Sequence, residues 1–352
     1  MTTTVAGHSR VRARARAALG IALAAMLVFL AGCGGKGKSQ GAAPASTASP
    51  AAPALFPLTG LPAGDAATRA RPALSVKIDN IDVARPQAGL NQADVVVEQP
   101  VEGGLTRLFA TWQSKDAAEV GPVRSARPVD ALLLRQLGPS LFAFAGASAG
   151  VLKVIRNASG ATLLDSSSAP DAYRRVSGRS PPHNTFTSTA ALYAAGRRVN
   201  PKLGPPRDLL TFAARQSAAA KPVRTARLQF SPAARSSWQW TGKSFVRSQD
   251  GTADKLVDGS TVSSDNVVVL SVAVRPSGNV DVLGNPTPDP DLIGSGRAWV
   301  LRDGTMVAAT WRRAAVGSQT QLLGADGQPI PLHPGRTWIE LLPAPQQPSF
   351  SS

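Results

Sequence analysis

Apolar runs separated by turn residues mark the first third of the chain. The segment "PALSVKIDN" (72–80) predicts a strand, and the three consecutive valines at 95–97 predict a buried strand. Residues 105–112 predict a second strand that pairs with the valine run through a tight turn at Gly103-Gly104. These patterns place two or more strands in one sheet.

Helical spacing follows in the same region. Residues 129–138 have a helical pattern that ends at a glycine, and residues 151–158 have another. Between them, the segment 140–150 begins as an apolar strand. Strands that alternate with helices predict an α/β-layered N-terminal domain.

The pattern changes after Lys221. Short runs such as "SWQWTG", "NVVVLSVAV" and "GRAWVLRDGTMVAATW" are separated by Gly, Asp, Asn and Pro, and Arg302-Asp303-Gly304 marks a hairpin. The fold class is therefore predicted as mixed α+β, an α/β-layered N-terminal domain with a smaller β-rich C-terminal one. We expect these domains at 58–221 and 222–343, followed by a disordered tail at 344–352.

The first 32 residues have the composition of an export signal. Four arginines between positions 10 and 16 precede an apolar run from Ala17 to Leu30, and small residues follow. A basic region, an apolar region and a small-residue cleavage site predict a secretory signal peptide at 1–32. The apolar run is shorter than the roughly 20 residues that a spanning helix needs.

Cys33 is the single cysteine of the protein and directly follows Leu30-Ala31-Gly32. This order resembles the bacterial lipobox, in which the cysteine becomes the lipidated first residue of the mature chain. The alternative is a stray buried thiol near the cleavage site. Two or more acyl chains give stable anchoring, so we expect attachment to the extracytoplasmic face of the cell membrane.

The stretch after Cys33 and the charge of the chain narrow the choice of partners. Residues 33–57 are rich in Ala, Pro, Ser and Gly, which predicts a disordered tether. Loss of the signal peptide lowers the net charge from +16 to +12. No nucleic-acid-binding motif accompanies this charge, so we expect an anionic envelope ligand or envelope protein as partner and no nucleic acid.

Charged residues gather around turns in the N-terminal domain. Glu98 and Glu102 follow the valine run, Arg107 lies inside an apolar strand, and Arg124 and Arg127 lie in "GPVRSARP". A buried arginine needs a partner, and Glu98 or Glu102 across the hairpin is the natural one for Arg107. Two interpretations stay open: a structural Glu–Arg network, or a site for an anion.

A second candidate is the segment Gly146–Gly150, "GASAG". It matches the G-x-S-x-G pattern with Ser148 at its centre, after an expected strand and before an expected helix. His183 follows Ser148 by only 35 positions, and no oxyanion segment precedes the serine. A structural or anion-holding turn is therefore favoured over a serine nucleophile.

The histidines and the spacing of the remaining motifs indicate few further candidate site residues. His183 and Asn184 follow a double proline in "RSPPHNTF", where His183 could act as a base, as a hydrogen-bond donor or as a cap. No metal-ligand spacing is present, so no metal site is expected. Phosphate-loop and dinucleotide motifs are absent as well, so no cofactor is expected.

Several segments in order resemble the YerB-type bacterial lipoprotein family. They include "PLTGLP", "RPALSVKIDN", "VEGGLTRLFA", "GPVRSARP" and "PPHNTF", and later "GSGRAWVLRDG" and "LHPGRTWIELLP". The resemblance covers nearly all of 57–343 and implies an exported, lipid-anchored, two-domain protein. It implies no reaction. The positions that match the recurrent motifs are Arg85, Glu98, Glu102, Arg107, Arg124, Arg127, His183 and Asn184.

Three hypotheses for function follow. The first is a membrane-anchored protein that binds an anionic envelope ligand through Arg107, Arg124 and Arg127. The second is an envelope hydrolase or transferase that uses Ser148 or Glu102 with His183. The third is an envelope scaffold without a small-molecule site, in which the arginines are structural.

Overall fold

The computed structural model describes residues 53–215, 220–281 and 284–352. The predicted signal peptide, Cys33 and most of the predicted tether lie outside these residues. Within the described residues, no helix is both long enough and apolar enough to cross a membrane.

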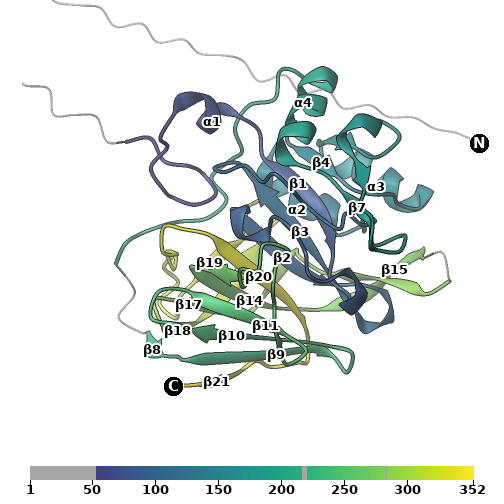
Figure 1. Cartoon of the computed structure of the whole chain (residues 1–352). Coiled ribbons are helices and arrows are strands. Elements are labelled where there is room, and N and C mark those ends of the chain that lie inside the picture. Colours follow the sequence, from purple (N-terminus) through teal and green to yellow (C-terminus); the bar gives the residue numbers. More distant parts are fainter. Residues whose placement is uncertain (1–52, 216–219, 282–283) are drawn as a thin grey trace, which may run out of the picture. The chain divides into compact units, whose positions relative to one another are not determined.

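The N-terminal part alternates strands with helices, as the sequence predicts (Figure 1). Its strands are β1 (Leu74–Asp79), β2 (Val95–Pro100), β3 (Thr106–Trp112), β4 (Leu141–Ala143), β5 (Thr162–Leu164), β6 (Arg174–Arg175) and β7 (Thr185–Phe186). Its α-helices are α1 (Ala66–Ala70), α2 (Asp130–Leu137), α3 (Ala149–Ala158) and α4 (Thr189–Val199). Short 3-10 turns are η1 (Asp82–Ala84), η2 (Leu90–Gln92), η3 (Glu102–Gly104) and η4 (Pro170–Ala172).

The C-terminal part consists of strands in the described residues. These are β8 (Lys221–Pro222), β9 (Thr225–Ser231), β10 (Ala234–Trp240), β11 (Phe245–Gln249), β12 (Thr252–Ala253), β13 (Ser263–Ser264), β14 (Asn266–Val272), β15 (Val274–Val280), β16 (Pro286–Pro290), β17 (Gly294–Arg302), β18 (Thr305–Arg313), β19 (Gln321–Leu323), β20 (Thr337–Pro343) and β21 (Ser349–Ser351). The fold class is therefore the predicted one, a mixed α/β part and a β-rich part.

One large sheet contains strands from both parts. Its order is β19-β18-β17-β14-β20-β2-β3-β1-β4-β5, with β8 beside β18. The joint is β20, which pairs in parallel with β14 on one side and with β2 on the other. A parallel pair needs no short connection, so residues more than 200 positions apart become neighbours, as Figure 1 shows for β2 and β20.

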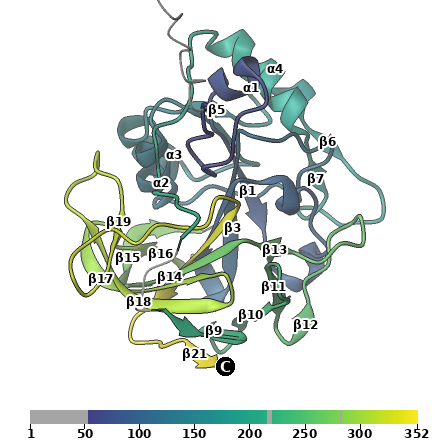
Figure 2. The same ribbon diagram turned by 90° about the vertical axis from the view of Figure 1, so that its left-hand side faces the viewer.

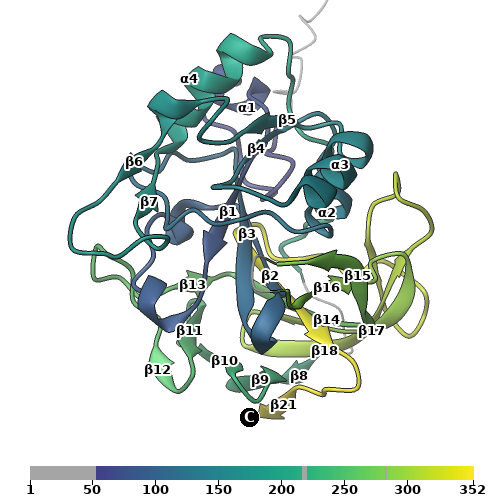
Figure 3. The same cartoon turned by 90° about the vertical axis from the view of Figure 1, so that its right-hand side faces the viewer.

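The two faces of this sheet are covered differently. On one face, alternate residues of β2 and β3 such as Val97 and Phe109 pack with α2 and α3. On the other face, Val96 and Leu108 pack with the second sheet, β12-β11-β10-β9-β21 with β13 beside β11. Figures 2 and 3 show α2 and α3 on one side of β1 and β3, and β11 to β13 on the other.

The last residues differ from the predicted disordered tail. Ser349–Ser351 form β21, which extends the second sheet along the edge strand β9. Backbone groups of an edge strand are unpaired and accept a further strand, and the ring of Phe350 lies 6.4 Å from that of Trp299. Ser349–Ser351 are too short to show a periodic pattern, so this strand could not be predicted from the sequence.

Candidate functional site

The candidate site lies at the carboxyl end of β1. Strands β1 and β4 run in parallel only as far as Val76 and Ala143. Beyond that point the segment 122–124 lies beside β1 instead: Asp79 N donates to the Pro122 carbonyl at 2.9 Å, and Arg124 N donates to the Lys77 carbonyl at 2.8 Å. The backbone of 122–124 therefore takes the place of β4 beside β1 at this end of the sheet.

Two cationic or polar side chains meet on a single oxygen of Asp79. Arg124 Nε lies 2.8 Å from Asp79 Oδ2 in an ion pair, and His183 Nδ1 lies 2.7 Å from the same oxygen. Asp79 is 1% exposed, whereas the side chains of Arg124 and His183 are 20% and 15% exposed. The buried carboxylate therefore orients two groups that reach the surface.

Arg127 is held by Glu102, which lies in η3. Its Nε and Nη2 donate to Glu102 Oε2 at 2.9 and 2.6 Å, and Thr287 of β16 donates to Glu102 Oε1 at 2.6 Å. Burial opposes ionisation of Glu102, but the hydrogen bonds from Arg127 and Thr287 outweigh it and lower the pKa of Glu102. Nη1 of Arg127 donates to the Ala126 carbonyl at 2.9 Å, so each nitrogen of this guanidinium group has a protein acceptor.

Arg107 has no such partner. It lies on β3 directly opposite Asp79 of β1, and it is 8% exposed. Its Nη1 donates to the Ser125 carbonyl at 3.1 Å, and its Nε is buried without a partner. Burial, together with the charges of Arg127 and Arg124, lowers the pKa of Arg107 to about 10. Burial of the Arg107 cation without a carboxylate partner therefore lowers the stability of the folded protein.

A buried pair lies beneath these residues. Lys77 Nζ donates to Asp130 Oδ1 at 2.8 Å, and both side chains are fully buried. Gln99 Nε2 donates to the same oxygen at 3.1 Å, and Arg127 N donates to Asp130 Oδ2 at 2.7 Å. Burial and the charges of Arg107 and Arg127 lower the pKa of Lys77 to about 8, despite the attraction of Asp130.

The charges around β1 therefore do not pair completely. The cations are Lys77, Arg107, Arg124 and Arg127, and the carboxylates in contact with them are Asp79, Glu102 and Asp130. Asp289 of β16 lies near Asp130, yet it forms no ion pair with any of the four cations. Among the described residues, Arg107 is the cation of this group without a carboxylate. We call Arg107, Arg124, Arg127, Asp79 and His183 the arginine cluster.

The expected pairing of Arg107 across the hairpin is not found. Glu102 binds Arg127, and Glu98 points to the opposite face of the sheet, because side chains alternate along a strand. There Glu98 accepts hydrogen bonds from Thr106 Oγ1 at 2.7 Å and from Arg247 of β11. The neighbour of Arg107 on β2 is Gln99. Neither glutamate is therefore the partner of Arg107.

Arg247 is the centre of a second buried network. It is fully buried, pairs with Glu98 and Asp254, and lies 5.0 Å from the ring centre of Trp338. Glu340 of β20 lies directly opposite Glu98, and burial with the nearby charge of Glu98 raises the pKa of Glu340 well above its usual range. This network joins the two sheets, and its ion pairs are fully buried.

Two other candidate residues lie outside the cluster. Arg85 pairs with Asp82 and, at 3.2 Å, with Asp250. Asn184 accepts a hydrogen bond from Arg175 Nη1 at 2.8 Å and is buried. Both contacts fasten loops, so the structure does not bring Arg85 or the Asn184 side chain together with the arginine cluster.

Ser148 occupies the expected turn between β4 and α3. Its hydroxyl caps α3 by accepting from Val151 N at 3.4 Å. In the part of the chain that the structure describes, Ser148 forms no hydrogen bond with His183, whose Nδ1 is bound to Asp79. The geometry corresponds to a helix cap.

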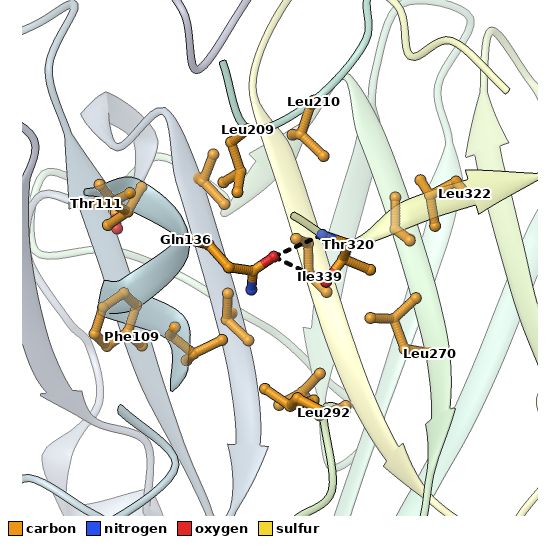
Figure 4. Close-up of a pocket in the computed structure, with 16 residues that line it drawn as sticks. Phe109, Thr111, Gln136, Leu209, Leu210, Leu270, Leu292, Thr320, Leu322 and Ile339 are labelled. Atoms are coloured by element: carbon orange, nitrogen blue, oxygen red, sulfur yellow. Dashed lines mark hydrogen bonds between the residues drawn. The ribbon is translucent and has the colours of Figure 1, made fainter. Parts of the chain in front are cut away.

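An apolar cavity of about 50 Å³ lies on the helix-covered face of the large sheet (Figure 4). Gln136 of α2 reaches across it and accepts from Thr320 N and Oγ1, both at 2.8 Å. Ligand pockets are several times larger, at roughly 300–1,000 Å³, so this cavity is a packing defect between the halves of the sheet. The described residues contain no group of three or more potential metal ligands.

Several residues of the site escape sequence analysis. Asp79 reads as a turn residue, and Lys77 and Asp130 read as parts of a strand and a helix. One signal was available: Lys77 interrupts the apolar run "LSVKID", and a lysine buried in a strand requires an acidic partner.

Comparison with known proteins gives the relatives of this chain. Residues 58–202 match the N-terminal domain of a protein family of unknown function (DUF3048), and residues 226–339 match its C-terminal domain. YerB of Bacillus subtilis (strain 168), named as a candidate lipoprotein, is 28% identical over 300 residues, which is 82% of this chain and 86% of YerB. The crystal structure of B. subtilis YerB is similar with a TM-score of 0.72 at 27% identity, covering 84% of this chain and 99% of that one. The resemblance seen in the sequence is confirmed.

Proposed function

The chain belongs to the YerB-like family of two-domain proteins of unknown function, and on the geometry of the arginine cluster we propose that it binds an anionic ligand of the cell envelope. The observation that carries this proposal is Arg107, a buried guanidinium without a carboxylate partner in the described residues. A ligand anion would supply the missing charge.

The place of action follows from the N-terminal sequence. Cys33, in its lipobox-like context, would carry the lipid, and residues 34–57 would tether the folded part to the extracytoplasmic face of the membrane. The name of the B. subtilis relative supports a lipoprotein. The negative partners at that face are wall polymers, anionic lipids and their fragments.

Free donor groups favour an anion at the cluster over a purely structural role. Arg107 Nη2 and both Nη atoms of Arg124 have no protein partner in the described residues, and none of them is sealed from solvent. Guanidinium groups match the geometry of carboxylates and phosphates. Arg127, which Glu102 holds, would not contact the ligand.

Titration calorimetry on the full-length protein tests this proposal. Inorganic phosphate, propyl phosphate and propionate serve as probes. Arg107→Gln and Arg124→Gln should each weaken binding by about tenfold or more, because a hydrogen bond to a charged group contributes about 1.5–3 kcal/mol.

Arg227→Gln is the matched control, because Arg227 lies exposed on β9, in the second sheet. Its affinity should equal that of the wild type. Equal affinity of all four proteins for every probe, or no binding by any of them, would refute the anion site and favour the scaffold interpretation.

A further inference from the structure

We propose that the ligand of the arginine cluster carries a hydroxyl group close to its anionic group, and that Nε2 of His183 accepts the hydrogen of that hydroxyl. The inference rests on the proposed function and narrows it to a chemical class.

Asp79 fixes the tautomer of His183. An ionised carboxylate only accepts hydrogen bonds, and Asp79 Oδ2 lies 2.7 Å from His183 Nδ1. The same oxygen lies 2.8 Å from Arg124 Nε, so the cationic Arg124 also holds the carboxylate in its acceptor role. The proton of a neutral His183 therefore sits on Nδ1, and Nε2 presents a lone pair.

Nε2 of His183 is free to meet a ligand. It has no hydrogen-bond partner among the described residues, and it is not sealed from solvent. The arginine side chains of the cluster are donors only. The cluster thus offers several donors, from Arg107 and Arg124, and a single outward acceptor beside them.

This combination of several donors and one acceptor favours anions that also carry a hydrogen-bond donor. A fully deprotonated phosphate ester or carboxylate accepts hydrogen bonds from the arginines, but it has no hydrogen to donate. One of its oxygen lone pairs would therefore face the lone pair of Nε2. A ligand with a hydroxyl one or two carbons from the charge satisfies both, because its anionic oxygens accept from the arginines and its hydroxyl donates to Nε2. Polyol phosphates and hydroxy-carboxylates, including sugar acids, share this chemistry.

Matched ligand pairs test the inference by calorimetry at pH 8. Glycerol 1-phosphate is compared with propyl phosphate, and lactate with propionate. We expect the hydroxylated member of at least one pair to bind the full-length protein about three- to tenfold more tightly, the range of one net hydrogen bond. Preference within the phosphate pair alone would identify polyol phosphates, and within the carboxylate pair alone hydroxy-carboxylates.

Variants of His183 show whether Nε2 is the acceptor. His183→Phe should bring the two affinities within the preferred pair to about the same value, whatever its effect on the affinity of both members, because phenylalanine offers no acceptor to the hydroxyl. His183→Gln retains an acceptor oxygen and should preserve part of the preference for the hydroxylated ligand. If His183→Phe fails to fold, this variant still tests whether residue 183 supplies the acceptor.

Two outcomes would overturn the inference separately from the binding site itself. If both members of each pair bind equally while Arg107→Gln still weakens them, the anion site stands and the role of His183 is wrong. If the preference persists undiminished in His183→Phe, another group accepts the hydroxyl. Failure of all four ligands to bind would remove both proposals.

Discussion

Replacing Arg247 with methionine should lower the free energy of unfolding by about 3–5 kcal/mol, the usual cost of removing one partner from a buried ion pair. Arg247 is fully buried and pairs with Glu98 and Asp254, which are buried as well. Methionine would fill the space beside Trp338 but would leave two carboxylates without a counter-charge. The free energy of unfolding is measured by urea denaturation, and the dependence of this free energy on urea concentration (the m value) should equal that of the wild type.

Glu340→Gln provides the matched control for Arg247. Because burial and the charge of Glu98 raise the pKa of Glu340, its carboxyl group favours the neutral form, which glutamine imitates. The amide oxygen can still accept from Trp238 Nε1, which now lies 2.7 Å from Glu340 Oε1. This variant should stay within about 1 kcal/mol of the wild type. A loss below 1 kcal/mol in Arg247→Met would contradict the network.

Lys77→Met should raise the free energy of unfolding by about 1–3 kcal/mol at pH 7, since the lowered pKa of Lys77 means that burying its charge costs more than the attraction of Asp130 returns. The double variant Lys77→Met with Asp130→Asn should keep this gain, because no buried charge remains. Lys153→Met, on the exposed face of α3, should change stability by less than about 0.5 kcal/mol. A loss of more than about 1 kcal/mol in both the single and the double variant would show that the packing of Lys77, and not its charge, decides its contribution to stability.

The pH dependence of the free energy of unfolding tests the buried charge of Lys77 in a second way. The pKa of Lys77 falls from 10.5 to about 8 in the folded protein. Between these values the unfolded chain binds a proton that the folded chain has released, so the free energy of unfolding rises with pH. The contribution is roughly 3 kcal/mol across this window. It should appear as the difference between the wild type and the double variant, and a difference that is flat from pH 8 to 10.5 would contradict it.

The local elements of the N-terminal part were predictable because each has its own pattern. The valine run at 95–97 lies in β2, the segment 105–112 contains β3, and the helical spacing at 129–138 contains α2. Burial on one side of an element imposes a period that the sequence displays. These patterns also located the turns on which the charged residues lie.

The partners of the charged residues were not predictable. Glu98 and Gln99 are neighbours in sequence, yet they face opposite sides of the sheet, and a shift of one residue exchanges the two faces. The partner of Glu98 is Arg247, 149 positions away. Sequence analysis therefore found the arginines but assigned Arg107 a glutamate that it does not contact.

The pairing of β20 with strands of both parts could not be predicted from the sequence either. Strand β20 lies between β14 and β2 although it comes last of the three in the chain. Its pattern predicts a strand but contains nothing that specifies parallel neighbours. Long-range pairing of this kind depends on the whole fold, as does the contact of Thr287 with Glu102.

The central claim is that Arg107 is retained for a ligand and not for stability. Comparing the free energy of urea unfolding of Arg107→Met and the wild type, without and with added phosphate, tests it most directly. We expect the variant to be about 1–2 kcal/mol more stable without phosphate, because a buried cation with a lowered pKa and no carboxylate is removed. Phosphate should then stabilise the wild type but not the variant. A variant that is less stable than the wild type by more than 1 kcal/mol without phosphate would show that Arg107 is a structural element of the fold.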